Sequence, residues 1–223
     1  MMKNYDELRS KKLLNLYSGA ITDIMDEMGE EFRNQTLPSN LRPLKNSMKV
    51  SGPVYTVRGN KRFYDDGKDP RYKQMDMLDG IFPGCVILMD SGDEKSAAHW
   101  GELMSKTSME KGATGAIING GIRDTEEIIN HNFPVFASYH SPLTAVYRYN
   151  IIDFDKPIII ENVRIYPGDY IFGDIDGIIC IPKNIIDEVL EKSEIIKEKE
   201  NIVRQELSNG KNIRNLFEKY KVF

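Results

Sequence analysis

Apolar residues follow two different periods along this chain, and their alternation predicts an α/β protein. Leu8, Leu13 and Tyr17 recur at helical spacing near the start, which predicts a first helix. A second short helix is expected after Thr22, a candidate N-cap, and it should stop at Gly29. Helical and strand-like segments then alternate as far as residue 137.

The first strand is expected over 50–57, with an interruption at Gly52-Pro53. Residues 59–69 are polar and rich in turn-forming residues. Asp69-Pro70 suits an N-cap followed by proline at the first helical position, so a helix should begin there and run through Phe82.

The middle of the chain contains two strand–loop–helix units in succession. An apolar strand over 85–89 leads through a polar loop to a helix, and a second strand over 114–119 runs into Gly120-Gly121 and Arg123-Asp124 before the next helix. A third strand returns over 133–137. Such units predict a small parallel or mixed sheet whose loops gather at one end, where binding sites usually lie.

Beyond residue 150 the strands become short and closely spaced, separated by turn sequences such as Pro167-Gly168-Asp169. This spacing predicts antiparallel β structure packed on the earlier sheet. A long amphipathic helix over about 184–207 and a shorter one over 211–220 should complete the chain. With no internal repeat and no long linker, we expect one domain, 1–223, with a C-terminal helical extension.

Composition narrows the functional classes. Lys and Arg are scattered among Asp and Glu, and the formal net charge is −4, so no basic face for nucleic acid is expected. Met1–Lys12 is polar, which predicts no signal peptide, and no apolar run is long enough to span a bilayer. Cys85 and Cys180 lie in apolar stretches and should be buried, reduced thiols. A cytoplasmic protein with no membrane partner is expected.

Arg123-Asp124 is the first candidate for chemistry, because it follows a strand and precedes a helix. Gly120 and Gly121 would let the backbone approach a ligand closely or take a positive φ. Arginine offers a planar fork for a carboxylate, and aspartate offers a hard oxygen for Mg²⁺ or Mn²⁺. Alternatively, Asp124 caps the following helix and Arg123 pairs with a surface carboxylate. These residues alone leave both interpretations open.

A second candidate is the segment from His99 to Met104, at the entry to a helix. Free backbone N–H groups there could hold a substrate carboxylate or an enolate oxygen, and Glu102 could reach a metal-bound water. An ordinary helix start, with Glu102 at the positive end of the helix dipole, explains the same pattern. His131 and His140 are expected on the surface or in loops.

Other familiar sites lack support in the sequence. There is no HExxH, CxxC or histidine cluster for zinc, and no glycine-rich nucleotide loop. Asp174 and Asp176 could bind a cation, but aspartate beside glycine more often forms a turn.

Nearly the whole chain resembles the RraA-like family, which includes 4-hydroxy-4-methyl-2-oxoglutarate aldolases and regulators of ribonuclease activity A. The most specific feature is an acidic residue followed, after twenty positions, by Arg-Asp, here Glu102 and Arg123-Asp124. The other segments that carry the resemblance are Ile21-Thr22-Asp23, Gly52–Val57, Pro83–Asp90, Trp100–Leu103, Lys111–Gly115, Phe133–Phe136, Pro167–Asp169, Gly173–Gly177 and the helix with Glu200.

The resemblance implies a swivelling β/β/α-type domain that assembles as a homotrimer or homohexamer. It implies a divalent-metal-dependent lyase, an aldolase or oxaloacetate decarboxylase, that cleaves a C–C bond of a pyruvate-containing 2-oxo acid through a metal-stabilised enolate. Arg123 and the backbone of Gly101, Glu102, Leu103 and Met104 would hold the pyruvyl unit. Asp124, Glu102 and a neighbouring subunit's Glu200 would hold Mg²⁺ or Mn²⁺.

Departures from the family pattern bear on the substrate. His99 stands where a small apolar residue is expected, Asn119 stands where Asp is common, and the polar stretch 60–72 reshapes the predicted pocket mouth. Two alternatives remain open: a non-catalytic regulator that binds a ribonuclease or other partner, and a lyase acting on a different hydroxy or sugar acid.

Overall fold

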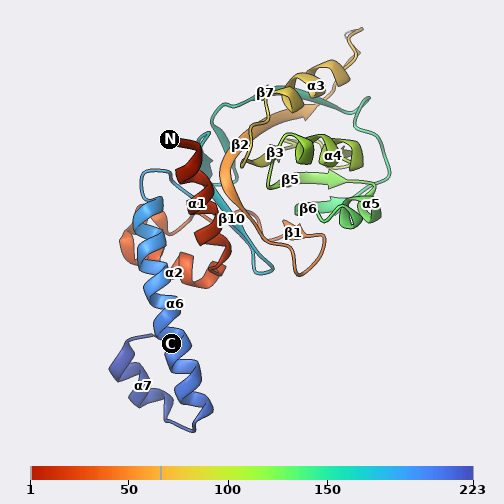
Figure 1. Ribbon diagram of the computed structural model, residues 1–223. Helices are drawn as coiled ribbons and strands as arrows, with labels where there is room; N and C mark the ends of the chain where they lie inside the picture. The colour runs from red at the N-terminus through yellow and green to blue at the C-terminus, as the bar shows by residue number, and fades with distance from the viewer. Residues whose placement is uncertain (1, 66, 223) are drawn as a thin grey trace.

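The computed structural model describes residues 2–65 and 67–222. It confirms the α/β class, a curved mixed sheet with helices packed against it (Figure 1). The helices in the described part of the chain are α1 (Met2–Leu14), α2 (Ser18–Met28), α3 (Arg71–Asp79), α4 (Glu102–Glu110), α5 (Thr125–Asn130), α6 (Ile186–Ser208) and α7 (Ile213–Tyr220), with a 3₁₀ turn at Glu30–Phe32.

The main sheet has nine strands among the described residues, and a separate two-stranded hairpin packs beside it. The main-sheet strands are β1 (Arg42–Pro43), β2 (Val50–Lys61), β3 (Val86–Asp90), β4 (Ala98–Trp100), β5 (Gly115–Ile122), β6 (Val135–His140), β7 (Tyr149–Phe154), β10 (Tyr170–Gly173) and β11 (Ile178–Ile181). The hairpin consists of β8 (Ile158–Ile160) and β9 (Val163–Ile165).

Strand order places the parallel strands at the centre of the sheet. The path runs β1-β6-β5-β3-β2-β10-β11, with β4 beside β5 and β7 beside β2. Strands β2, β3, β5 and β6 are mutually parallel, and β4 runs parallel to β5. The carboxyl ends of β3, β4, β5 and β6 therefore point toward the same edge, which is where ligands bind in open α/β sheets.

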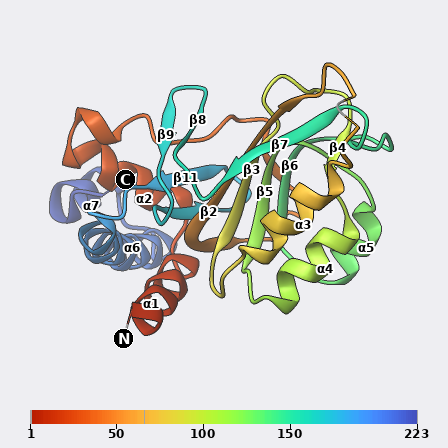
Figure 2. The same ribbon diagram turned by 90° about the horizontal axis from the view of Figure 1, so that it is seen from above.

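Side chains alternate between two apolar cores across this sheet, as the period of a strand requires. In β3, Ile87 and Met89 face the core under α3, α4 and α5, whereas Val86 and Leu88 face the core shared with the β8–β9 hairpin. Figure 2 shows α3, α4 and α5 side by side over one face of the sheet. A third core joins α1, α2 and the start of α6 to β10 and β11.

Several element boundaries differ from the sequence-based expectations. Helix α2 begins at Ser18, so Thr22 lies inside it and bonds back to the Ser18 carbonyl instead of acting as N-cap. Strand β2 runs unbroken through Gly52-Pro53. Helix α3 ends at Asp79, before Phe82.

Strand β5 likewise continues beyond the expected end at residue 119, through the glycine pair that could have taken a positive φ. Neither Gly120 nor Gly121 has a positive φ. A side chain on Gly121 would collide with the Ala97 carbonyl and the Tyr139 ring. The absence of a side chain at Gly121 thus lets these neighbouring segments pack closely against β5.

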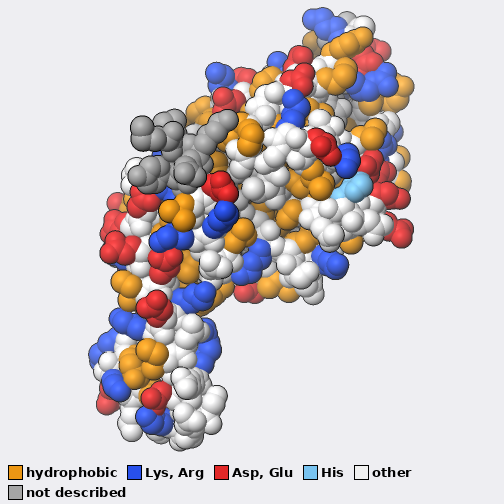
Figure 3. All heavy atoms as spheres, viewed as in Figure 1, with side chains coloured by type: hydrophobic (Ala, Val, Ile, Leu, Met, Phe, Trp, Pro, Cys, Tyr) orange, Lys and Arg blue, Asp and Glu red, His pale blue; other side chains and the backbone are white. Residues whose placement is uncertain are grey.

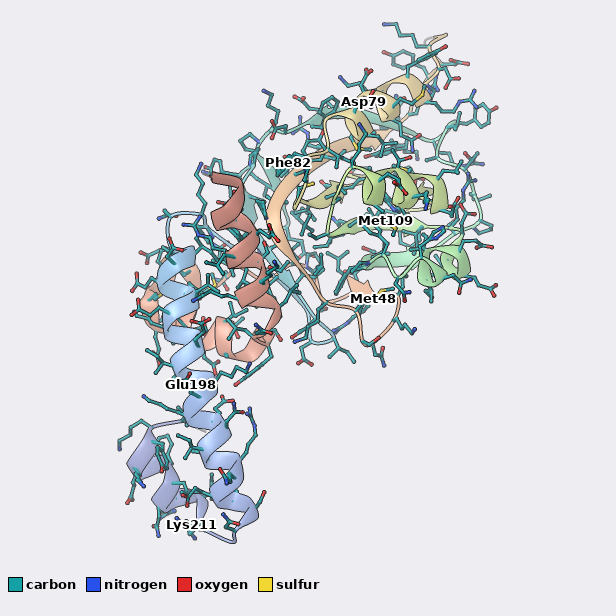
Figure 4. All side chains as sticks on the ribbon, viewed as in Figure 1. Met48, Asp79, Phe82, Met109, Glu198 and Lys211 are labelled. Atoms are coloured by element: carbon teal, nitrogen blue, oxygen red, sulfur yellow. The ribbon has the colours of Figure 1, made fainter. Side chains whose placement is uncertain are left out.

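The C-terminal helices form an arm that leaves the body of the protein (Figure 1). In Figure 4, Glu198 lies near the point where α6 departs from the body, and Lys211 lies at the far tip. The long helix expected over 184–207 is α6, and α7 folds back on it through a small apolar cluster, Val203, Leu216 and Val222. Among the described residues, no helix is both long enough and apolar enough to cross a membrane.

Candidate active site

A pocket of about 550 Å³ opens where the carboxyl ends of β4 and β5 meet α3 and the segment before β7. Its floor comes from His99, Trp100 and Gly101 at the end of β4 and from Arg123 and Asp124 at the end of β5. The opposite walls consist of Asp69–Tyr72, Gln74, Met75 and Leu78, of Leu103, Met104 and Thr107, and of Thr144–Val146, Tyr149 and Ile151.

Strand pairing brings Arg123 and Asp124 beside the start of α4. The Arg123 N–H donates to the Trp100 carbonyl at 3.0 Å, which ties the ends of β4 and β5 together. The Arg123 side chain is 47% exposed, and its Nε lies 3.7 Å from Asp124 Oδ2. Within the described part of the chain its guanidinium makes no closer polar contact, so its donors are available to an anion in the pocket.

The Asp124 side chain does not cap helix α5, which was the alternative interpretation of this residue. It precedes α5 in the left-handed conformation, φ 57° and ψ 37°, and its side chain makes no capping hydrogen bond to that helix. Its Oδ2 instead accepts the Glu102 N–H of α4 at 3.2 Å. A left-handed aspartate costs on the order of 1 kcal/mol, and such strain is concentrated at functional sites.

Gly101 provides room for this carboxylate. Its backbone is extended, φ −152° and ψ −173°, a conformation that any residue can adopt. A Cβ at this position would stand 2.7 Å from Asp124 Oδ2 and about as close to the Arg123 side chain as van der Waals contact allows, at 3.6 Å. An alanine here would therefore force the Asp124 carboxylate to shift, so the glycine matters for the position of that carboxylate and not for backbone freedom.

Glu102 begins α4, and its side chain is turned toward α5. Its Oε1 lies 2.9 Å from His131 Nε2, and the two side chains are 24% and 31% exposed. His131, expected on the surface, thus contacts a residue of the predicted site. No local pattern indicates this contact, because it depends on α4 and α5 packing side by side. His140 hydrogen-bonds through Nδ1 to Thr125.

His99, at the pocket floor, is buried together with Glu94. The Gly121 N–H donates to His99 Nδ1 at 3.1 Å, so Nε2 carries the proton and faces Glu94 Oε2 at 3.0 Å. Burial lowers the pKa of His99, although Glu94 opposes this shift. Burial also opposes ionisation of Glu94, but hydrogen bonds from Ser96 and Ala97 lower the pKa of Glu94 overall. This pair fixes the loop that leads into β4.

Glu200 does not reach the pocket of its own subunit. It lies on α6, where its carboxylate accepts hydrogen bonds from Tyr17 and Arg204. Asp174, the other candidate, accepts the Asp176 N–H within its own turn and the Ser18 N–H at the start of α2, so its carboxylate connects these two segments. Cys85 and Cys180 are buried, and burial raises the pKa of the Cys85 thiol to about 11.

The donor set fits a hydrated hard cation but not a closed metal cage. No group of three or more His, Cys, Asp or Glu side chains in the described part of the chain is arranged to hold a metal ion. Asp124 alone lines the pocket with a carboxylate beside the gap at Gly101. Mg²⁺ commonly binds through one or two carboxylates and retains several waters, so Asp124 suits it.

Sequence reasoning predicted only part of the pocket lining outside the floor. Asp69 and Arg71 precede or begin α3, and Met75 and Leu78 lie within it, so they reach the pocket because α3 packs beside α4 over the sheet. The polar stretch 60–72 was a signal for Asp69 and Arg71, but nothing in the sequence indicated that Met75 and Leu78 would line the pocket. Thr144–Val146 also line the pocket, from a loop with no distinctive sequence.

Comparison with known proteins gives one family. The Aldolase/RraA family model, RraA-like, matches residues 21–180. The chain is 27% identical over 94% of its length to Protein DlpA of Legionella pneumophila, but spans only 33% of that protein. It is 29% identical over 70% of its length to a Halalkalibacterium halodurans protein named "Putative 4-hydroxy-4-methyl-2-oxoglutarate aldolase", of which it covers 71%.

Solved structures share this architecture. One described as a novel cellulase from microbes associated with the gut ecosystem has a TM-score of 0.82 and 35% identity, over 88% of this chain and 86% of that one. Streptomyces coelicolor RraAS2, described as an unusual member of the RNase ES inhibitor RraA protein family, has a TM-score of 0.77 and 20% identity, over 89% and 96%. With the family model spanning most of the sheet and the whole pocket floor, the chain belongs to the RraA-like, Aldolase/RraA family.

Proposed function

We propose that this protein is a divalent-metal-dependent carbon–carbon lyase, an aldolase or oxaloacetate decarboxylase, acting on a pyruvate-containing 2-oxo acid. The observation that carries the proposal is the position of Asp124. Its carboxylate is turned away from its own helix, toward the start of α4, and lies next to an available arginine. Aldolase names among the relatives support the same reaction class.

The residues that line the pocket would have two roles, to bind the substrate and to stabilise the charge that develops during the reaction. Arg123 would bind the substrate carboxylate and orient the bond to be cleaved. Leu103 and Met104 lie in the first turn of α4, where backbone N–H groups lack intrahelical acceptors and can donate to an oxygen in the pocket. Asp124 would hold Mg²⁺ or Mn²⁺, which supplies Lewis-acid stabilisation of the negative charge developing on the 2-oxo oxygen.

Glu102 would support the cation's hydration, and His131 fixes the orientation of its carboxylate. A second subunit's Glu200 would complete this side of the site in a homotrimer or homohexamer. Hydrophobic side chains lie on the surface of the arm (Figure 3), and the exposed residues include Ile202 and Phe217, which supports such assembly. Sedimentation equilibrium distinguishes these oligomers from a monomer.

Glycoside hydrolysis fits this pocket less well, despite the cellulase description of one similar structure. Hydrolysis of that kind uses two carboxyl groups, one of them protonated to act as general acid. Asp69 and Asp124 are the carboxyl groups among the described lining residues. Hydrogen bonds from the Arg71 side chain lower the pKa of Asp69 to about 2, so Asp69 is ionised at neutral pH and cannot protonate a leaving group.

A purely regulatory role, as in ribonuclease inhibition, does not need the constrained Asp124 or the space at Gly101. The structural likeness to RraAS2 concerns the fold. Binding to a ribonuclease that persists in EDTA and in Asp124→Ala, without any lyase activity, would favour that role instead.

The test is pyruvate release from oxaloacetate and from 4-hydroxy-4-methyl-2-oxoglutarate, coupled to lactate dehydrogenase, with Mg²⁺ or with EDTA. We expect metal-dependent release that falls at least about 100-fold in Asp124→Ala. Glu126→Ala is the matched control, because Glu126 is an exposed carboxylate on the first turn of the same helix, outside the pocket. Equal activity in both variants would contradict the assignment.

A further inference from the structure

Apolar side chains form much of the pocket lining outside the floor, beside the polar Gln74, Thr107 and Thr144. Met75 and Leu78 come from α3, Met104 from α4, and Val146 and Ile151 from the segments around the start of β7. All but Met75 are at least half-buried in the subunit. The part of a substrate that lies beyond the pyruvyl unit would therefore contact hydrocarbon.

Arg71 is the only cationic side chain besides Arg123 among the described residues that line this pocket. Its charge is already paired. Arg71 Nε donates to both oxygens of Asp69 at 2.9 Å, and Nη2 donates to Oδ2 at 2.5 Å. A second substrate carboxylate would have to displace Asp69 or bind beside its negative charge.

The neighbouring lysine does not change this balance. Lys73 lines an adjoining pocket on the other side of Tyr72, together with Asn150. Its ammonium group lies 5.0 Å from the centre of the Phe154 ring, where the ring face attracts it. Lys73 thus lies outside the pocket that contains Arg123.

Of the two proposed reactions, aldol cleavage is the one that this lining favours, and we propose that its preferred substrate carries one carboxylate, on its pyruvyl end, and an apolar substituent at C4. This inference rests on the proposed lyase function and concerns the fragment released with pyruvate. Buried apolar contacts favour an alkyl or aryl group, whereas a carboxylate in the same place would lose its water without gaining a free cation. The 4-hydroxy-4-methyl-2-oxoglutarate of the named relatives carries such a second carboxylate.

The reaction then balances without any further reactant. In a 4-hydroxy-2-oxo acid the C3–C4 bond breaks, and its electron pair passes to C3 as the enolate of pyruvate. The 4-hydroxyl loses its proton as C4 becomes the carbonyl of an apolar aldehyde. C3 then takes up one proton, so the products are pyruvate and the aldehyde, with no oxidation or reduction.

The first measurement compares binding of two 2-oxo acids that have no 4-hydroxyl and cannot be cleaved by this reaction. Calorimetry with Mg²⁺ would compare 5-methyl-2-oxohexanoate with 2-oxoglutarate, which differ chiefly by an isopropyl group in place of the distal carboxylate. We expect the alkyl acid to bind on the order of tenfold or more tightly. Equal or tighter binding of 2-oxoglutarate would overturn the proposal.

A matched pair of variants tests the cause of this preference. Asp69→Asn keeps the acceptor for the Arg71 backbone N–H but releases the Arg71 charge, so affinity for 2-oxoglutarate should rise several-fold while that for the alkyl acid stays unchanged. Asp76→Asn makes the same charge change on the exposed side of α3, outside the pocket, and should alter neither affinity. If the two variants behaved alike, the role of the Asp69–Arg71 pair would be refuted.

Turnover separates this inference from the proposed function. Pyruvate release would be measured from 4-hydroxy-5-methyl-2-oxohexanoate and from 4-hydroxy-2-oxoglutarate, with the expected ratio of kcat/KM at least tenfold in favour of the first. Cleavage that favours the dicarboxylate overturns the inference and leaves the lyase intact. Selective binding of the alkyl acid without cleavage of either compound supports the inference on the pocket and contradicts the lyase.

Discussion

Asp124 and Gly101 show how single residues shape the pocket. Asp124 occupies the position of a helix N-cap, a common role for aspartate, yet its carboxylate serves the neighbouring helix α4. Sequence alone could place Arg123 and Asp124 after a strand, but it could not reveal that Asp124 has a positive φ. That conformation depends on the packing of β4 against β5, through contacts distant in sequence.

Gly101→Ala tests whether the space beside Asp124 matters. The new Cβ would meet Asp124 Oδ2 at 2.7 Å and displace the carboxylate, while the extended backbone tolerates alanine without strain. We expect kcat/KM for pyruvate release to fall at least about tenfold, with a small change in Tm. Gly177→Ala is the control, since nothing lies within 4 Å of its added Cβ. Full activity in Gly101→Ala would show that the space has no function.

At the scale of elements, hydrophobic periodicity predicted most strands and helices but misplaced several boundaries. Strand β2 continues through Gly52-Pro53 because this dipeptide lies where the strand changes neighbours, from antiparallel β10 to parallel β3. Pro53 pairs with Tyr170 at the last position beside β10, and Gly52 is needed because a Cβ would collide with the Gly84 carbonyl. Neither the change of strand neighbours nor the close approach of the Gly84 carbonyl can be predicted from the residues around Gly52-Pro53.

The short strand β4 was missed for a related reason. Three residues, Ala98–Trp100, are too few for a periodic pattern, and they form a strand because β5 is long enough to pair with them. The buried Glu94–His99 pair holds the preceding loop in place. His99 also packs edge-on against the Tyr149 ring, with ring centres 4.6 Å apart. A buried histidine thus stands where the family pattern led us to expect a small apolar residue.

Burial of neutral His99 makes stability depend on pH. The folded-state pKa of His99 is lowered from 6.5, so the folded and unfolded states bind the same protons above that value. As pH falls below 6.5, the unfolded state takes up a proton that the folded state refuses, and stability is lost. Between pH 7 and 5.5 we expect this residue to contribute a loss of at most about 1 kcal/mol.

Urea denaturation at both pH values measures this loss. His99→Gln should remove the pH-dependent part, whatever its effect on stability at pH 7, because glutamine does not titrate. His140→Gln is the control, since His140 is exposed. Identical pH dependence in wild type and His99→Gln would show that His99 does not resist protonation.

At the scale of the whole molecule, the α/β body and the C-terminal arm have different relations to the sequence. Both arm helices could be predicted from their amphipathic patterns, because α6 and α7 are formed largely by local contacts. The direction of the arm could not, since it follows from how α6 packs on α2 and β11 in the third core. The same holds for the pocket wall formed by α3, which depends on the arrangement of the whole sheet.

In the proposed function, the pocket at Arg123 and Asp124 stabilises the enolate of pyruvate, whatever group the natural substrate carries. Exchange of the pyruvate methyl protons for deuterium, followed by proton NMR in D₂O with Mg²⁺, tests this directly. We predict that the protein accelerates exchange above the metal-only rate, and that Asp124→Ala and Arg123→Ala abolish the acceleration while Glu126→Ala retains it. No acceleration by the folded wild-type protein, or full acceleration in Asp124→Ala, would contradict enolate stabilisation by this pocket.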